Sequence, residues 1–227
     1  MLHTVTQTQA ERLIHVINAG LVKGKGEAVL GNMCLESAIS YATGEPFSDS
    51  PKCVSKTVKR VSICLNDSQW ENDKQRSRCL LKLGVAQLGS VNIDQRAFSK
   101  LFISKLETKF IPLILNEQAA KKLRAKLAYA AADAADAAYT ADAYANADAY
   151  AANADANANA DAYAAYTADA AYIAYAAAAS AAYGYGYGYN KKYYDLKQAI
   201  INLAVETLIE LKSPGCKYLF LCEDSAS

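Results

Sequence analysis

The sequence predicts an all-α protein, a helical domain that carries an inserted, hairpin-like helical segment rich in alanine and tyrosine. Three observations lead to this prediction. Apolar residues outside the insertion recur at helical spacing, capping residues and glycines mark helix ends, and alanine dominates residues 128–183. We expect a helical core at 1–127, the insertion at 128–190, and a C-terminal helix and tail at 191–227 that complete the core.

Residues 1–116 have the pattern of several short amphipathic helices. The expected helices are about 8–19, 32–43, 51–65, 71–88 and 95–106. Gly20, Gly44 and Gly89 mark three of the stops. Ser50 followed by Pro51 is a favourable N-cap and first helical residue for the third helix. The last helix is capped by Asp94, and Pro112 lies where a helix restarts or kinks.

The segment 195–211 has the clearest amphipathic pattern in the chain. Its apolar face comprises Leu196, Ile200, Leu203, Ala204, Thr207, Leu208 and Leu211. The turn residues 213–215 end this helix, and 217–222 is a short apolar run that fits a strand or a buried tail. Such a helix needs a partner surface, and residues 1–116 are the expected one.

The insertion admits more than one conformation. Of the 56 residues from 128 to 183, 32 are Ala, 9 are Tyr, 7 are Asp and 4 are Asn. Alanine favours helix, and we prefer a helical hairpin that is weakest near 153–159. A silk-like sheet competes, because Ala alternates with other residues through 141–163 and period two is typical of strands. Disorder is the third alternative. The tyrosines suit either adaptable recognition of flat polar ligands or packing between helices.

Charge and composition exclude several classes of protein. The net charge of +1 divides into −7 on residues 128–183 and +1 − (−7) = +8 on the remainder, a split that marks a partner surface or compositional drift. Six cysteines without a CxxC pair, and only two histidines, offer no zinc site. No apolar run fits a membrane helix, residues 1–20 lack a secretory pattern, and nucleic-acid binding would need more basic surface. We therefore expect a cytoplasmic protein with reduced, buried thiols and no metal or cofactor.

The motifs along the chain are mostly typical of structural roles. Cys34 and Glu36 lie two residues apart and so occupy different helix faces, which argues against a catalytic pair. We expect Cys34 to be buried, and Glu36 to be a buried, paired carboxylate. The loop 23–27, Lys-Gly-Lys-Gly-Glu, lacks the spacing of a phosphate-binding loop and is expected to be solvated. Asn66 and Asp67 are expected to end one helix and cap the next, and Trp70 is expected to anchor the core.

The residues carrying a family resemblance are Gly31, Met33, Cys34, Glu36, Ser37, Ala38, Tyr41, Ala42, Gly44, Asn66, Asp67, 86–89 (Ala-Gln-Leu-Gly) and 213–215 (Ser-Pro-Gly). In these residues the chain resembles a family of uncharacterised bacterial and phage proteins that carry a variable Ala-rich block before the last helix. The resemblance covers roughly half the chain. It implies a bacterial or phage origin and a shared helical core, and it implies no activity.

The function we predict is capture of a small ligand without chemistry. One form is a phage-encoded sponge that sequesters a nucleotide immune signal in the host cytoplasm as a counter-defence. Aromatic rings would stack on the base, and basic or polar groups would hold the remainder. The candidate binding residues are Trp70, Arg76, Tyr185, Tyr187, Tyr189, Glu36, Asn66 and Asp67. The alternatives are a structural or protein-interaction role, with the Ala-rich segment forming homo-oligomers, and an enzyme that uses Cys34 or Glu36.

Overall fold

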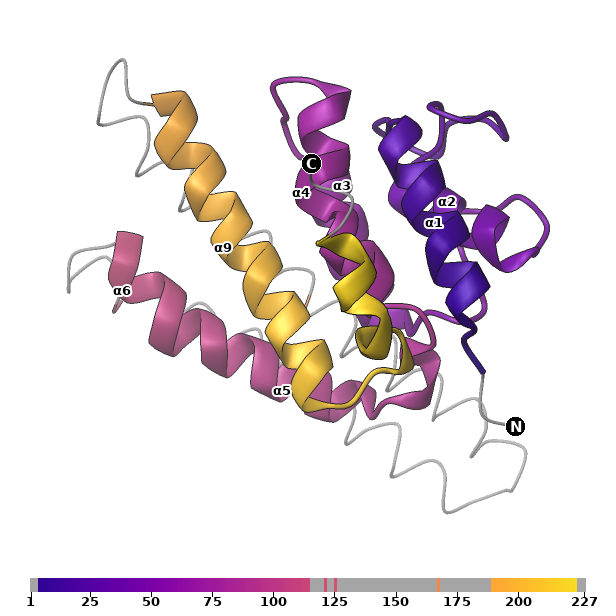
Figure 1. The fold of residues 1–227 in the computed structure, drawn as a ribbon. Coiled ribbons are helices and arrows are strands. Elements are labelled where there is room, and N and C mark those ends of the chain that lie inside the picture. The colour runs from indigo at the N-terminus through magenta and orange to yellow at the C-terminus, as the bar shows by residue number, and fades with distance from the viewer. Residues whose placement is uncertain (1–3, 115–120, 122–124, 126–166, 168–188, 224–227) are drawn as a thin grey trace, which may run out of the picture. The chain divides into compact units, whose positions relative to one another are not determined.

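The computed structural model describes residues 4–114, 121, 125, 167 and 189–223 (Figure 1). Within them the regular structure is helical, and the only β pairing is two isolated bridges that join Met33 to Leu21 and to Gly26. The predicted all-α class is therefore confirmed for this part of the chain. Nearly all of the predicted insertion at 128–190 lies outside the described residues. The oligomerisation role predicted for this segment therefore stays a prediction.

The chain divides into two compact units, Met1–Asp94 with Ile201–Ser227, and Gln95–Ile200. The first unit contains α1 (Gln7–Ala19), α2 (Leu35–Thr43), α3 (Lys56–Asp67), α4 (Asp73–Ala86), the 3-10 turn η1 (Ser90–Asn92) and the 3-10 helix η4 (Pro214–Cys222). The second contains α5 (Gln95–Lys105), the π-helical turn η2 (Leu106–Phe110) and α6 (Ile111–Ile114). Helix α9 (Tyr189–Glu210) runs from the second unit into the first.

Helix α1 begins and ends close to where the sequence predicts. Thr6 is its N-cap: the backbone N–H of Gln9 donates to Thr6 Oγ1 (3.3 Å), and the N–H of Thr6 donates to Gln9 Oε1 (3.0 Å). This reciprocal capping box satisfies backbone donors that a helix start leaves open. Gly20 ends the helix with a φ of 130°.

Helix α2 begins later than predicted. It starts at Leu35 instead of Asn32, because the backbone before it is used in other pairings. The N–H of Val22 donates to the carbonyl of Met33 (2.9 Å), and the N–H of Cys34 donates to that of Lys25 (3.3 Å). Cys34 is the N-cap residue, and its Sγ accepts from the N–H of Ser37 (3.4 Å).

The predicted start of the third helix at Ser50 and Pro51 is wrong. Helix α3 begins at Lys56 and is capped by Ser55, whose Oγ accepts from the N–H of Val58 (3.2 Å). Pro51 instead lies in a turn, where its carbonyl accepts from the N–H of Val54 (3.3 Å). Ser55, five residues after Ser50, thus takes the capping role.

The remaining boundaries of the first unit need one further correction. Asn66 and Asp67 close α3 as expected, but they do not cap α4. That helix starts at Asp73, and its N-cap is Asn72, whose Oδ1 accepts from the N–H of Gln75 (2.8 Å). The segment between α3 and α4 contains Trp70, which is 8% exposed.

Helix α1 packs against both α2 and α4 in the first unit. Its buried face, with Leu13 and Ile17 fully covered, lies against Gly84 of α4. A β-carbon at Gly84 would lie 2.7 Å from Ile17 Cδ1 and 3.0 Å from Leu35 Cδ1. Glycine at this position therefore allows α4 to approach its neighbours closely.

The C-terminal segment packs on α4 and α1. Ser213 Oγ donates to the carbonyl of Ala86 (2.7 Å), the N–H of Gly215 donates to that of Leu88 (2.8 Å), and Tyr218 Oη donates to that of Val5 (3.0 Å). The strand considered for 217–222 is wrong, since these residues lie in the 3-10 helix η4.

The predicted apolar face of 195–211 is buried apart from Leu211, which is half-buried. The buried surface of α9 is wider than predicted, because Ile201 and Val205 are also buried.

In the second unit, α5 leads into a π-helical turn just before Pro112. Proline cannot donate a backbone hydrogen bond, and the N–H of Ile111 just before it donates to the carbonyl of Leu106, five residues earlier. The rings of Phe98 and Phe102 stack within this unit at a centroid distance of 5.7 Å. Ser99 Oγ accepts from Thr167 Oγ1 (2.7 Å).

Candidate functional site

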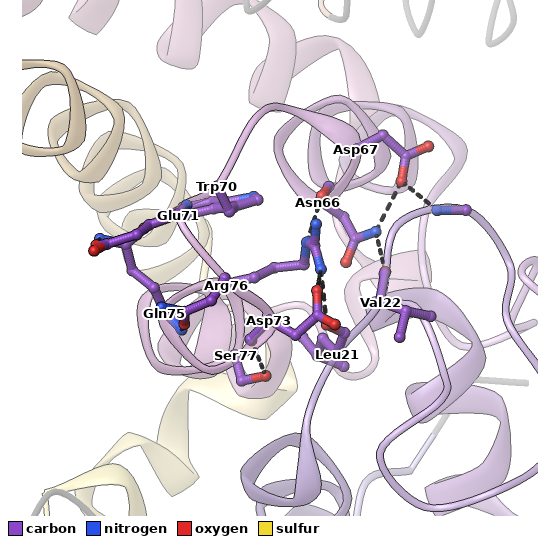
Figure 2. A network of polar contacts seen from close by, with 12 residues as sticks. Leu21, Val22, Asn66, Asp67, Trp70, Glu71, Asp73, Gln75, Arg76 and Ser77 are labelled. Carbon is purple, nitrogen blue, oxygen red and sulfur yellow. Dashed lines mark hydrogen bonds and ion pairs between the residues drawn. The ribbon is translucent and has the colours of Figure 1, made fainter. Parts of the chain in front are cut away.

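Four of the residues predicted to bind ligand lie around the end of α3, as Figure 2 shows. They are Asn66, Asp67, Trp70 and Arg76. The close-up shows that the long side chain of Arg76 reaches from α4 toward Asn66 and Leu21. Trp70 lies at the left of the view, away from Val22 and Asp67. The structure therefore brings these four residues into one neighbourhood, although their individual roles differ.

Arg76 is committed to internal hydrogen bonds. The residue is 6% exposed, and its guanidinium donates from Nε to the carbonyl of Asn66 (3.0 Å) and from a terminal nitrogen to the carbonyl of Leu21 (2.9 Å). The same nitrogen pairs with Asp73 one turn earlier on α4. A buried guanidinium needs such partners, so Arg76 ties α4 to the end of α3 and to the segment after α1.

Asn66 connects three segments through one side chain. Its Nδ2 donates to the carbonyl of Val22 (3.0 Å) and to Asp67 Oδ1 (2.8 Å). Its Oδ1 accepts from the N–H of Leu35, the first residue of α2 (3.3 Å). Asn66 thus does cap a helix, but the helix is α2, which precedes it by about thirty residues in the chain.

Trp70 anchors the core, as the sequence suggested. Its indole Nε1 donates to the carbonyl of Leu65 near the end of α3 (3.0 Å). Burying the ring while satisfying its N–H is the usual arrangement for a structural tryptophan. Of the three tyrosines predicted to stack on a ligand, Tyr185, Tyr187 and the side chain of Tyr189 lie outside the described residues.

A pocket of about 310 Å³, including its open mouth, lies at the meeting point of these segments. Its lining residues are Gly24, Lys25, Cys34, Leu35, Glu36, Asp49, Ile63, Asn66 and Asp67. Three of them, Glu36, Asn66 and Asp67, were predicted from the sequence, whereas Trp70 and Arg76 are not part of the lining. Without the open mouth the cavity volume is about 70 Å³, well below the range of about 300–1,000 Å³ typical of ligand pockets, so the pocket has room only for a small group.

The rim of the pocket is formed by the loop after α1. Gly24 and Gly26 both have a φ of 69°, a left-handed conformation that favours glycine. The N–H of Gly24 donates to Asp67 Oδ1 (2.9 Å), and the carbonyl of Lys25 accepts from Ser37 Oγ (3.0 Å). The loop is exposed, as expected, yet its backbone is held against α2 and α3.

Two charged residues of the lining were not among the predicted binding residues. Lys25 is exposed, and its ammonium lies over the ring of Phe47 at 5.3 Å. Asp49 is half-buried and comes from the segment between α2 and α3. The sequence carried no signal for Asp49, because only the tertiary fold brings this segment beside the end of α3.

Glu36 is the least ordinary group in the lining. Its residue is 1% exposed, and Ser62 Oγ on α3 donates to Glu36 Oε1. The other oxygen, Oε2, has no hydrogen-bond partner among the residues that the structure describes. The pKa of Glu36 is raised to about 7, chiefly by burial and also by Asp49, while Ser62, Gln87 and Lys59 oppose the rise. The expectation of a buried carboxylate is confirmed, but its described polar partner is a hydroxyl and not a cation.

Further buried polar groups accompany Glu36. Ser40 follows it by one turn on α2, and Gln87 follows the end of α4; both are fully buried. Within the described part of the chain, Ser40 Oγ and both polar atoms of the Gln87 amide are also unpartnered by the distance and angle limits of a hydrogen bond. A weak hydrogen bond between the Gln87 side chain and Glu36, outside those limits, nevertheless lowers the pKa of the carboxyl. Unsatisfied buried polar atoms are few in native proteins, so this concentration of them beside a pocket stands out.

Cys34 does not have the character of a nucleophile. Burial raises the pKa of its thiol above the usual value, and nearby Glu36 raises it further, although hydrogen bonds from Ser37 oppose the shift. A thiol attacks as the thiolate, and reactive cysteines have lowered pKa values. The structure instead assigns Cys34 to the N-cap of α2. Among the described residues, no group of three or more His, Cys, Asp and Glu could hold a metal ion.

No protein-family model, curated protein or solved structure matches the chain. The resemblance to a family of uncharacterised bacterial and phage proteins therefore stays a prediction from the residues quoted above. No helix in the described ranges combines the length and apolar character needed to cross a membrane.

Proposed function

We propose that the chain is a non-catalytic binding protein for a small molecule with a positively charged nitrogen group, held in the pocket beside the start of α2. The observation that carries this proposal is the charge of the lining. Glu36, Asp49 and Asp67 supply carboxyl groups, and Lys25 supplies one ammonium. A concave site with an excess of one charge attracts a ligand of the other sign.

The contacts around the pocket support binding more than catalysis. The thiol of Cys34 has a raised pKa, so it holds its proton at neutral pH. Asn66 uses its amide to hold Val22 and Leu35 in place, which makes it part of the wall. Rigid walls with a few polar groups are typical of sites that recognise a small molecule.

A nucleotide ligand, the form predicted from the sequence, would bring the opposite charge. Phosphate groups beside Asp49 and Asp67 would experience repulsion, and only Lys25 in the lining would attract them. Arg76, which was expected to help, already donates to Leu21 and Asn66. The pocket therefore favours an amine or guanidine over a phosphate, and both classes belong in one experiment.

The test is thermal unfolding and calorimetry of the full chain with a panel of ions. Methylguanidinium, agmatine and putrescine are the cations; inorganic phosphate, adenosine monophosphate and cyclic adenosine monophosphate are the anions. We expect at least one cation to raise Tm and the anions to leave it unchanged, because a ligand that binds only the folded state stabilises it. The proposal would be overturned if a nucleotide raised Tm, or if none of the cations did.

A pair of variants locates the binding. Asp49→Asn removes one carboxylate from the lining, and Asp195→Asn removes an exposed one from α9. We expect Asp49→Asn to weaken binding of the cation several-fold and Asp195→Asn to leave it unchanged. Equal effects of the two variants would show that the cation is not bound in this pocket.

A further inference from the structure

We propose that Glu36 is the group that receives the positively charged nitrogen of the ligand, and that it gives up a proton when the ligand binds. This inference rests on the proposed function and adds the atom that recognises the ligand. The geometry points to Oε2, the oxygen of a pocket-lining carboxyl that has no described partner within the distance and angle limits of a hydrogen bond, although the Gln87 amide lies near enough to interact with the carboxyl. The other carboxyl oxygen, Oε1, already accepts a hydrogen bond from Ser62 Oγ.

The empty pocket favours the protonated carboxyl. Glu36 is buried, and a carboxylate without a compensating positive charge is costly to bury. Its pKa of about 7 follows from that burial, and it leaves most molecules protonated in mildly acidic solution.

The charged groups near Glu36 do not neutralise a carboxylate in advance. Lys59 on α3 favours ionisation, but its ammonium donates to Ser50 Oγ (3.0 Å) in an exposed contact. Asp49, from the segment between α2 and α3, opposes ionisation. At the N-cap of α2 the nearby titratable group is Cys34, whose raised thiol pKa keeps it neutral. Gln87, just after α4, contributes a neutral amide whose hydrogen bond with Glu36 favours ionisation without supplying a charge.

Binding of a cation changes this balance. The N–H of an ammonium or guanidinium group donates to Oε2, and the proton of the carboxyl group leaves to water or buffer. One positive charge enters the site and one leaves it, so the buried region gains a paired carboxylate and cation. A charge-assisted hydrogen bond of this kind is about twice as strong as a neutral one. The same cation would bind less well to the protonated acid, so affinity rises as the pH approaches and passes the pKa of Glu36.

Calorimetry of the full chain measures the released proton directly. Methylguanidinium, agmatine and putrescine are titrated at pH 6.5 in two buffers that differ in their heat of protonation. The difference in observed heat gives the number of protons released. A carboxyl with a pKa near 7 should release roughly three-quarters of a proton at pH 6.5, and almost none at pH 9.

Two variants separate this inference from the general proposal. Glu36→Gln keeps the size and hydrogen-bonding capacity of the protonated acid; it should abolish proton release and reduce affinity by about tenfold or more at pH 8. Asp49→Asn should weaken binding while proton release persists. Circular dichroism and thermal unfolding of both variants check that they fold.

The outcomes distinguish the two ideas. Binding without proton release, or binding by Glu36→Gln with wild-type affinity, would overturn the role of Glu36 and leave the pocket as a cation site. If none of the three cations binds at any pH, the proposed function fails and this inference fails with it.

Discussion

Glu36 shows how one residue sets the behaviour of the whole pocket. A carboxyl group in the interior normally has a charged partner, whereas this one has a serine hydroxyl and, among the described residues, an unpartnered second oxygen. Burial therefore dominates, and the folded protein binds a proton more tightly than the unfolded chain does. That difference in proton affinity must appear in the stability of the fold.

The free energy of unfolding should fall as the pH rises through the range set by Glu36. Below its ordinary pKa of 4.5 the carboxyl is protonated in both states. Between 4.5 and about 7 only the folded protein retains the proton, so unfolding releases it and rising pH favours unfolding. At about 1.4 kcal/mol per pH unit, this group makes the protein roughly 3 kcal/mol less stable at pH 8 than at pH 4.5.

Glu36→Gln should remove that dependence. We expect the variant to equal the wild type near pH 4.5 and to exceed its stability at pH 8 by up to about 3 kcal/mol, because the amide has no charge to bury. Urea unfolding at several pH values measures the difference. Glu11→Gln, an exposed substitution on α1, serves as the control. If the difference in stability between Glu36→Gln and the wild type did not change with pH, the assignment would be contradicted.

Among the elements, α3 separates what the sequence could predict from what it could not. The helix itself was predictable, because Val58, Val61 and Leu65 repeat at helical spacing and are buried. Its start was not, since Ser50 with Pro51 and Ser55 are both acceptable caps by residue type. The choice depends on tertiary contacts: the N–H of Ser55 donates to Ser90 Oγ (3.1 Å), and this contact across the unit cannot be inferred from local sequence.

The pocket shows the same division. Glu36, Asn66 and Asp67 were identifiable as polar residues in an apolar or capping context, so the sequence indicated part of the lining. Asp49 and the exposed Lys25 were missed as ligand-binding residues, because their role depends on which loops meet beside α2. Arg76 was selected for its charge, and only its bonds to Leu21 and Asn66 reveal an internal role.

A pair of serine substitutions tests where α3 begins. Ser55→Ala removes the oxygen that accepts from the N–H of Val58, and should destabilise the protein by about 1 kcal/mol. Ser50→Ala removes only the acceptor for the Lys59 ammonium at an exposed residue and should cost less than about 0.5 kcal/mol. Urea midpoints with an unchanged slope measure both values. A larger effect at Ser50 would mean that the helix begins at Pro51.

At the scale of the whole chain, the first unit depends on contacts between residues that are far apart in sequence. The segment after α9 returns to the N-terminal helices, and Tyr218 bonds to the carbonyl of Val5. Ordering such a distant connection is entropically costly, so the contacts that it makes must be closely fitted. Gly215 is where that fit is tightest among the described glycines, since a β-carbon there would lie 2.0 Å from the carbonyl oxygen of Val85.

Gly215→Ala should therefore separate the C-terminal segment from α4. The added methyl group would also meet Leu88 Cβ at 2.9 Å, and backbone atoms cannot yield as a flexible side chain can. We expect a loss of stability of about 2 kcal/mol or more, together with faster amide exchange at Gly215, whose N–H donates to the carbonyl of Leu88. Lys217→Ala, an exposed substitution in the same 3-10 helix, should change stability by less than about 0.5 kcal/mol. If Gly215→Ala proves as harmless as Lys217→Ala, the C-terminal segment does not close the first unit in the way that its hydrogen bonds to Ala86 and Leu88 indicate.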